Sequence, residues 1–251
     1  MGGKSGQRKR ILIFNVNWLG DVLFSTAVIR NIRVNYPESY LACVVPPRCV
    51  PVLEDNPYLN EIIVFDEKAA HKGFWGKLAF IGFLRKKRFD SVFLLHRSFT
   101  RVLITWLAAI PERVGYDTAK RRFFLTKPVK PLDISRVHRI DYYLGVIKGA
   151  GLAVKDRHTN FFYGEKERIQ VEDFLKKNSL MPGDLVIGLN PGGNWGPKRW
   201  LKINFSALAD RLVEKLGAKI VITGSRDDAG LVDEIKSMMR SDAVSACGCL
   251  S

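Results

Sequence analysis

Long hydrophobic runs are missing from this sequence. The longest, residues 102–110, has nine residues counting Thr105, whereas a membrane-spanning helix needs roughly 18–20. The first ten residues also lack the apolar segment of a secretory signal, so we expect no such signal. The composition therefore disfavours an integral membrane protein and a secreted protein.

Cysteine and metal-ligand patterns are scarce too. The four cysteines, Cys43, Cys49, Cys247 and Cys249, have spacings unlike those of a structural zinc site. We interpret them as reduced thiols of a cytoplasmic protein. No cluster of His, Asp and Glu has metal-ligand spacing, so we expect no metal. The chain contains no GxGxxG, and no GK[ST] follows its glycine pair at 192–193, which disfavours simple dinucleotide-binding proteins and P-loop NTPases.

Acidic residues are few relative to basic ones, which gives a net charge of +15. Residues 1–160 hold 27 Lys and Arg against 13 Asp and Glu, while residues 161–251 are nearly balanced. The excess suits an anionic partner such as nucleic acid, an anionic membrane surface or an acidic glycolipid, and charge alone does not choose among them. The basic residues are spread over many elements without a nucleic-acid-binding motif, so we expect no specific nucleic acid.

What the chain does contain is a repeated alternation of strands and helices, which predicts an α/β fold with doubly wound parallel sheets. We expect strands at 11–14, 40–45, 61–65, 91–95 and 113–116, and helices from Asp21 onward and at 74–88, 102–110 and 138–150. A linker is expected at 152–163. The pattern then restarts with helices at 165–178, 205–216 and 227–239 and strands at 185–190, 219–224 and 243–247. We therefore predict two domains, residues 1–160 and 161–251. The second has too few strands for a finished sheet, so we expect a longer protein.

The first strand leads through Gly20 into a helix near Asp21, at the sheet edge where open α/β sheets bind ligands. A carboxylate at a helix start stays ionised because of the helix dipole and the backbone N–H groups. Asp21 is therefore either a functional carboxylate or only an N-cap. After the fourth strand, His96, Arg97 and Ser98 are candidates for the same edge, although a satisfied surface histidine is the simpler interpretation of His96.

A second turn, residues 190–194, follows a buried strand of the second domain. Its glycines Gly192 and Gly193 allow backbone amides to point into an anion-binding concavity, and Lys198 and Arg199 can neutralise phosphate charge. The alternative is an ordinary strand-to-helix turn followed by a solvated basic pair.

Together, NWLGDVLFST and PGGNWGPKRW resemble glycosyltransferase family 9, the ADP-heptose:lipopolysaccharide heptosyltransferases. The run NWLGD is most similar to that of the heptosyltransferase II members. SFTRVLITWLAAIPERVGY and HRIDYYL resemble the same family, and the likeness covers roughly residues 10–250 in order.

The resemblance implies a GT-B architecture, in which two Rossmann-like domains face a cleft and bind the acceptor and the nucleotide-sugar respectively. It implies inverting, metal-independent transfer from ADP-heptose, with no cofactor, to a lipid A–Kdo–heptose acceptor at the cytoplasmic face of the inner membrane. Asp21 matches the catalytic base and Gly20 lies on the acceptor side with His96, Arg97 and Ser98. The donor-binding matches are Gly192, Gly193, Asn194, Lys198 and Asp228.

Two departures from the family pattern are visible. Ala27 and Leu201 stand where Pro is usual, and the later D-[ST]-G-x-x-H segment, which binds the donor diphosphate, does not occur before Ser251. Two other hypotheses stay open at this point. One is a family 9 transferase with another nucleotide-sugar or acceptor, and the other is a non-catalytic, basic nucleic-acid-binding α/β protein.

Overall fold

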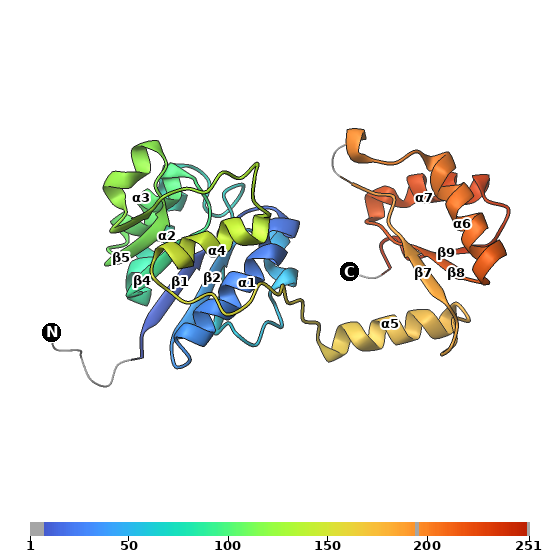
Figure 1. The fold of residues 1–251 in the computed structure, drawn as a ribbon, viewed down its shortest axis with the longest axis horizontal. Coiled ribbons are helices and arrows are strands. Elements are labelled where there is room, and N and C mark those ends of the chain that lie inside the picture. The colour runs from blue at the N-terminus through green and yellow to red at the C-terminus, as the bar shows by residue number, and fades with distance from the viewer. Residues whose placement is uncertain (1–7, 194–195, 250–251) are drawn as a thin grey trace. The chain divides into compact units, whose positions relative to one another are not determined.

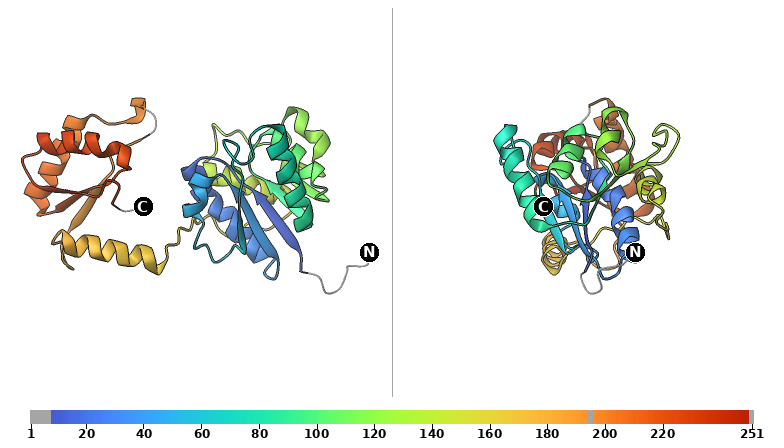
Figure 2. Two further views of the ribbon diagram at one scale, coloured as in Figure 1. Left: turned by 180° about the vertical axis from the view of Figure 1, so that it is seen from behind. Right: turned by 90° about the vertical axis from the view of Figure 1, so that its left-hand side faces the viewer.

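The computed structural model describes residues 8–193 and 196–249, in two compact units, Met1–Phe162 and Tyr163–Ser251. Each unit is a parallel sheet with helices packed on it (Figures 1 and 2). The predicted α/β class with parallel sheets is therefore confirmed. None of the helices in the described residues is long and apolar enough to cross a membrane.

The first unit contains a six-stranded sheet whose order is β3-β2-β1-β4-β5-β6, with every pair parallel. Beyond their first residues, the central strands β2, β1 and β4 are apolar, because both faces of the sheet are covered. The strand order reverses between β1 and β4, and this is where doubly wound sheets bind ligands. The strands are β1 (Arg10–Phe14), β2 (Tyr40–Val45), β3 (Glu61–Val64), β4 (Ser91–Leu94), β5 (Glu112–Tyr116) and β6 (Lys127–Val129).

Two hydrophobic clusters hold helices against the two faces of this sheet. One cluster packs α1 (Leu19–Asn35), α4 (Arg139–Gly149) and the 3-10 helix η1 (Pro47–Val52). The other packs α2 (Gly73–Lys87) and α3 (Phe99–Leu107). The two layers of helices are visible on either side of the strands in Figure 1.

In this unit one predicted helix has different bounds and one strand was not predicted. We expected a helix over 102–110, but α3 spans Phe99–Leu107, because Ala109 has a left-handed φ of 58° and Pro111 disfavours helix at the residue before it. The edge strand β6 was missed because its short KPV sequence contains Pro128, which is tolerated only at a sheet edge.

Residues 152–163, which we expected to be a linker, form no helix or strand, but residues 153–160 are fixed to α1. The Asn31 amide donates to Asp156 O at 2.9 Å, and the Asn35 amide donates to Ala153 O at 2.8 Å. The backbone N–H of Asn160 also donates to Thr26 Oγ1 at 2.9 Å. This segment is therefore part of the first unit rather than a free connection.

The second unit has a three-stranded parallel sheet of order β7-β8-β9. Its main core packs α6 and α7 on one face, and a small cluster around Val221 packs α5. Helix α6 begins three residues earlier than the expected 205–216. The elements are α5 (Glu165–Lys177), β7 (Val186–Leu189), η3 (Gly196–Lys198), α6 (Lys202–Leu216), β8 (Lys219–Ile222), η4 (Arg226–Asp228), α7 (Ala229–Met238) and β9 (Ala243–Ser245).

Candidate active site

Asp21 lies in the first turn of α1, at the carboxyl end of the central strand β1. The helix begins at Leu19 with Trp18 in the N-cap position, so Asp21 is not the N-cap residue. Its half-buried carboxylate accepts a hydrogen bond from the Tyr143 hydroxyl at 2.8 Å from Oδ1. Burial, and then this bond, raise the pKa of Tyr143, so the phenol stays protonated and donates to the carboxylate. One oxygen of Asp21 is thus oriented by a side chain of α4.

The turn before Asp21 is fixed by a buried arginine. Arg101 is 3% exposed and donates to Asn15 O at 2.8 Å and to Asn17 Oδ1 at 2.6 Å. It also pairs with Glu67 at 3.1 Å. Because its charge is paired with Glu67, the Arg101 guanidinium can stay buried and hold the strand-to-helix turn through Asn15 and Asn17. The turn that positions Asp21 therefore depends on a residue 80 positions later in the chain.

A cavity of about 480 Å³ opens beside Asp21, between the ends of β1 and β4. The predicted residues Asp21, His96, Arg97 and Ser98 all line it, while Gly20 is the exposed neighbour of Asp21 in the same helical turn. Sequence reasoning missed three further lining residues from the start of α4. These residues belong to the HRIDYYL segment, which resembles the family but was given no role in the site. The polar and aromatic side chains of the lining are Asn17, Trp18, Asp21, His96, Arg97, Ser98, Arg139, Tyr142 and Tyr143.

The electrostatic character of this pocket is cationic. Arg97 and Arg139 are exposed at its wall, and His96 is half-buried among arginines. Burial, followed by the charges of Arg101, Arg121 and Arg97, lowers the pKa of His96 to about 4. Its Nδ1 accepts the backbone N–H of Ser98 at 2.9 Å, as a neutral imidazole can. His96 is therefore an uncharged hydrogen-bonding group at neutral pH.

This lowered pKa predicts a pH effect on stability. The pKa of His96 is about 4 in the folded chain against an ordinary value of 6.5, so the unfolded chain binds the extra proton. Above pH 6.5 His96 is neutral in both states and does not lower the free energy of unfolding. As the pH falls from 6.5 toward 4, the unfolded chain takes up a proton that folded His96 does not, and the free energy of unfolding decreases. We expect His96→Asn, which keeps an acceptor for Ser98, to lose less stability over this range in denaturant titrations.

The exposed His158, with 79% of its side chain accessible, gives the matched control. His158→Asn should lose stability with falling pH as the unmodified chain does. If His96→Asn shows the same pH profile as the unmodified chain, His96 does not have the lowered pKa.

The second unit brings the expected donor-binding residues to the carboxyl ends of its strands. Gly192 follows β7 and Asp228 follows β8, and a Cβ placed on Gly192 would lie 2.7 Å from Asp228 Oδ2. That carboxylate is fixed because it accepts from Ser225 N at 2.9 Å and Ser225 Oγ at 2.7 Å, which lowers the pKa of Asp228. A side chain at position 192 therefore has no room, and the two loops meet closely.

The remaining loop residues follow in the same region. Arg199 Nε donates to Gly193 O at 2.8 Å, and Lys198 ends the exposed 3-10 helix η3. Asn194, the last predicted donor-binding residue, lies outside the described residues. Glycine backbone, an ordered carboxylate and two basic side chains are a chemistry suited to a nucleotide diphosphate.

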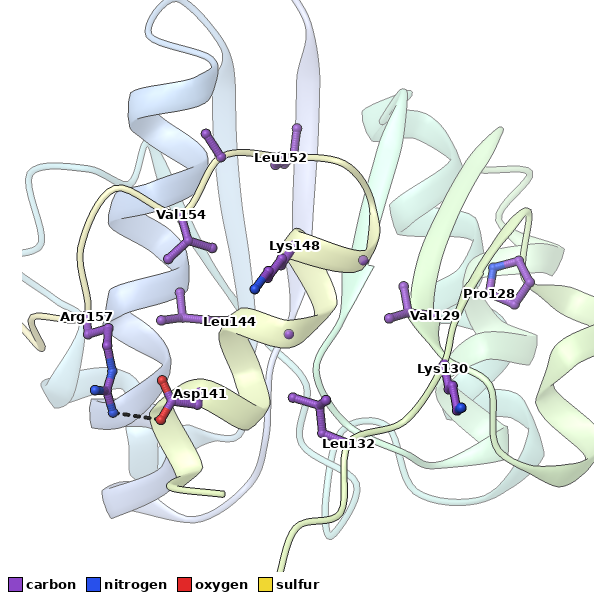
Figure 3. Close-up of a pocket in the computed structure, with 13 residues that line it drawn as sticks. Pro128, Val129, Lys130, Leu132, Asp141, Leu144, Lys148, Leu152, Val154 and Arg157 are labelled. Atoms are coloured by element: carbon purple, nitrogen blue, oxygen red, sulfur yellow. Dashed lines mark hydrogen bonds and ion pairs between the residues drawn. The ribbon is translucent and has the colours of Figure 1, made fainter. Parts of the chain in front are cut away.

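A larger hollow of about 830 Å³ lies elsewhere on the first unit (Figure 3). Leu144 and Lys148 of α4 line it together with Val129 of β6, and Arg157 pairs with Asp141 at its edge. It contains none of the predicted site residues. Among residues 8–193 and 196–249, no group of three or more His, Cys, Asp or Glu is placed to hold a metal ion. Metal independence stays a prediction.

Comparison with known proteins gives consistent matches along the chain. The family model described as glycosyltransferase family 9 (heptosyltransferase) matches residues 78–251. The chain is 30% identical to lipopolysaccharide heptosyltransferase 2 of Salmonella typhimurium, over 95% of this chain and 70% of that protein. It is 26% identical to lipopolysaccharide heptosyltransferase 3 of Escherichia coli, over 86% of this chain and 64% of that protein.

Solved structures agree with these sequence matches. A family 9 glycosyl transferase from Veillonella parvula has a TM-score of 0.89 at 28% identity, over 96% of this chain and 70% of that chain. The ADP-heptose lps heptosyltransferase II of Escherichia coli has a TM-score of 0.75 at 24% identity, over 95% and 72% of the two chains. The second likeness concerns the fold alone.

Proposed function

Because the chain belongs to glycosyltransferase family 9, we propose that it transfers heptose from ADP-heptose to the inner core of lipopolysaccharide. Its α/β fold of the GT-B type agrees with that family, and its membership removes the hypothesis of a non-catalytic nucleic-acid-binding protein. The finer part of the proposal is a lipid A–Kdo–heptose acceptor, as for a heptosyltransferase II.

The observation that carries this proposal is the placement of Asp21. Its carboxylate is held by Tyr143 at the strand switch point and opens onto a pocket with Arg97 and Arg139 on its wall. A sugar hydroxyl in this pocket would have a proton acceptor beside it, and the two cations suit an acidic glycolipid. In the proposed reaction Asp21 is therefore the general base and the pocket binds the acceptor.

The proposed step is a single displacement with inversion. The acceptor oxygen attacks the anomeric carbon, the bond from that carbon to the ADP oxygen breaks, and the hydroxyl proton passes to Asp21. Asp is a weak base, with an ordinary pKa of about 4. It serves here if the proton moves late, after the oxocarbenium-like carbon has withdrawn charge from the oxygen. No second carboxylate is needed as a nucleophile.

Departure of ADP would be assisted by the second unit. The backbone amides of Gly192 and Gly193 and the Lys198 ammonium would stabilise the negative charge that develops on the diphosphate. Asp228, whose carboxylate is already fixed by Ser225, would accept from a hydroxyl of the nucleotide ribose. These groups supply the stabilisation without a metal ion in the proposed reaction.

A donor and acceptor screen tests the function. Transfer is measured by mass spectrometry, with ADP-heptose compared with other nucleotide-sugars, and with lipid A–Kdo acceptors that carry or lack the first heptose. We expect product only with ADP-heptose and only with the heptose-bearing acceptor. Transfer from a different nucleotide-sugar would contradict the donor, and transfer to the acceptor without heptose would contradict the acceptor.

We also propose peripheral contact with the cytoplasmic face of the inner membrane, through the start of helix α2. Phe74 and Trp75 are 71% and 78% exposed and touch each other, and Leu78 and Phe83 are also exposed. Exposed aromatic rings on a helix that also carries basic residues, such as Arg85 in its last turn, are typical of helices that lie at an anionic lipid surface. This contact would bring the pocket to a lipid-anchored acceptor.

Replacing the two rings tests this contact. We expect Phe74→Ser with Trp75→Ser to weaken binding to vesicles containing anionic phosphatidylglycerol roughly tenfold in a sedimentation assay, because two interfacial side chains are lost. Phe161→Ser removes a ring that is 60% exposed elsewhere and should leave vesicle binding unchanged. An equal loss in both variants would contradict the assignment to α2.

A further inference from the structure

Arg121 is a buried cation that forms no ion pair with any of the described residues. It lies in the 3-10 helix η2 (Ala119–Phe124), is 2% exposed, and has Nε, Nη1 and Nη2 buried with no hydrogen-bond partner among the described residues. A guanidinium carries five N–H donors, and leaving them unsatisfied away from water is costly. Arg101, buried to the same degree, is paired with Asn15, Asn17 and Glu67. Residues 8–193 and 196–249 therefore leave the hydrogen-bonding capacity of the Arg121 guanidinium unused.

The Arg121 guanidinium lies over the carboxyl ends of β4 and β5. Its Nη2 is 3.2 Å from the position that a Cβ on Gly115 would take, and Leu94 Cβ is 3.1 Å from that same position. A side chain at residue 115 would displace the guanidinium or Leu94. Because Gly115 has no side chain, the Arg121 guanidinium fits at the carboxyl ends of β4 and β5, the sheet edge at which the pocket lies.

Two wall residues link Arg121 to the pocket. Tyr142 lines the cavity and is 2% exposed, and its buried hydroxyl has Arg97 nearby but no hydrogen bond of good geometry in the described part of the chain. The charges of Arg121 and Arg97 both act on Tyr142, and Arg97 lies 5.9 Å from the centre of its ring. The neutral state of His96 is favoured by the same two arginines. Tyr142 and Arg97 therefore line one end of the cavity, and the buried charge of Arg121 acts on that end from outside the lining.

We propose that Arg121 and the Tyr142 hydroxyl, with Arg97 beside them, form a subsite that binds an oxyanion of the acceptor sugar. The inference rests on the proposed function for the identity of the ligand, whose inner-core sugars supply carboxylate or phosphate. The planar guanidinium fork matches either group with two parallel hydrogen bonds. The bound anion would supply the counter-charge that Arg121 lacks, and would hold the acceptor with a hydroxyl near Asp21.

Binding of small anions to the whole chain tests the subsite without donor or turnover. Thermal unfolding and calorimetry are measured with Kdo, its neutral methyl ester and inorganic phosphate, each up to about 20 mM at constant ionic strength. We expect Kdo or phosphate to raise the melting temperature, and the methyl ester to have no effect. A rise with Kdo identifies carboxylate as the ligand group, and a rise with phosphate alone identifies phosphate.

Arg121→Met is the decisive variant. We expect it to melt at or above the temperature of the unmodified chain, because an unpaired buried charge is removed, and to bind the anion at least tenfold more weakly. The matched control is Arg122→Met, which removes the neighbouring guanidinium, 71% exposed and paired with Asp117, and should bind normally. Tyr142→Phe should weaken anion binding severalfold. If Arg121→Met does not fold, unchanged anion binding in Tyr142→Phe would overturn the subsite.

The outcomes separate this inference from the proposed function. No anion binding by the unmodified chain, or equal binding by Arg121→Met and the unmodified chain, would overturn the subsite. Arg121-dependent binding of Kdo or phosphate supports it whether or not heptose transfer is observed. Heptose transfer with unchanged acceptor KM in Arg121→Met would overturn the subsite and leave the proposed function intact.

Discussion

Replacing Asp21 by Asn should lower the turnover of heptose transfer at least ~100-fold, the usual range for loss of a general base. The amide keeps the shape of the carboxylate and can still accept from Tyr143, so the helix start should persist. Single-turnover measurements with saturating donor and acceptor would record the loss as a fall in kcat. ADP affinity should be retained, because the donor loop belongs to the other unit.

Tyr143→Phe is the companion to this variant, because it keeps the carboxylate and removes only the hydrogen bond to Oδ1. We expect a smaller fall in kcat than for Asp21→Asn, with the acceptor KM little changed. Near-normal turnover in Asp21→Asn would reduce Asp21 to a structural residue of the helix start, and would remove the proposed mechanism.

Lys198→Ala should weaken ADP binding by roughly 10–100-fold, since a charge-assisted phosphate contact contributes about 1.5–3 kcal/mol. The residue ends the exposed turn η3, six positions after Gly192, where its ammonium can reach a bound diphosphate. Transfer should slow as well, because the same charge stabilises the leaving group. Isothermal titration with ADP and steady-state kinetics would measure the two effects.

Lys215→Ala provides the control, because it removes an exposed lysine near the opposite end of α6. Its ADP affinity should match that of the unmodified chain. Unchanged affinity in Lys198→Ala would show that the phosphate loop has been assigned to the wrong residues.

The sequence predicted the fold class well, because buried parallel strands are continuous apolar runs that are recognisable in the sequence. Strand β2 was predicted at its observed bounds, Tyr40–Val45. The order of the strands did not follow, since pairing between β1 and β4 depends on contacts about 80 residues apart. The 3-10 helices η1 and η2 were missed as well, because such short turns leave no periodic pattern.

The sequence predicted the site residues that directly follow a strand, and missed those that only tertiary packing brings to the site. Asp21 follows directly from a strand-to-helix turn, and the residues after β4 follow from the same rule. Tyr143 lies 122 residues from Asp21, and only the packing of α4 against α1 joins them. Arg121 could not be distinguished from its exposed neighbour Arg122 by sequence, because burial is decided by the tertiary fold.

The register of the central sheet also sets when the first unit can fold during synthesis. Ile11 pairs with Ser91, so one edge of β1 has no partner until the ribosome has made β4. The side-chain amides of Asn31 and Asn35 donate within α1 and also to Asp156 O and Ala153 O, so their full set of hydrogen bonds needs residues 153–156. Nearly the whole unit must therefore emerge before its helices lock, and until then the apolar faces and one unpaired backbone edge of β1 stay uncovered.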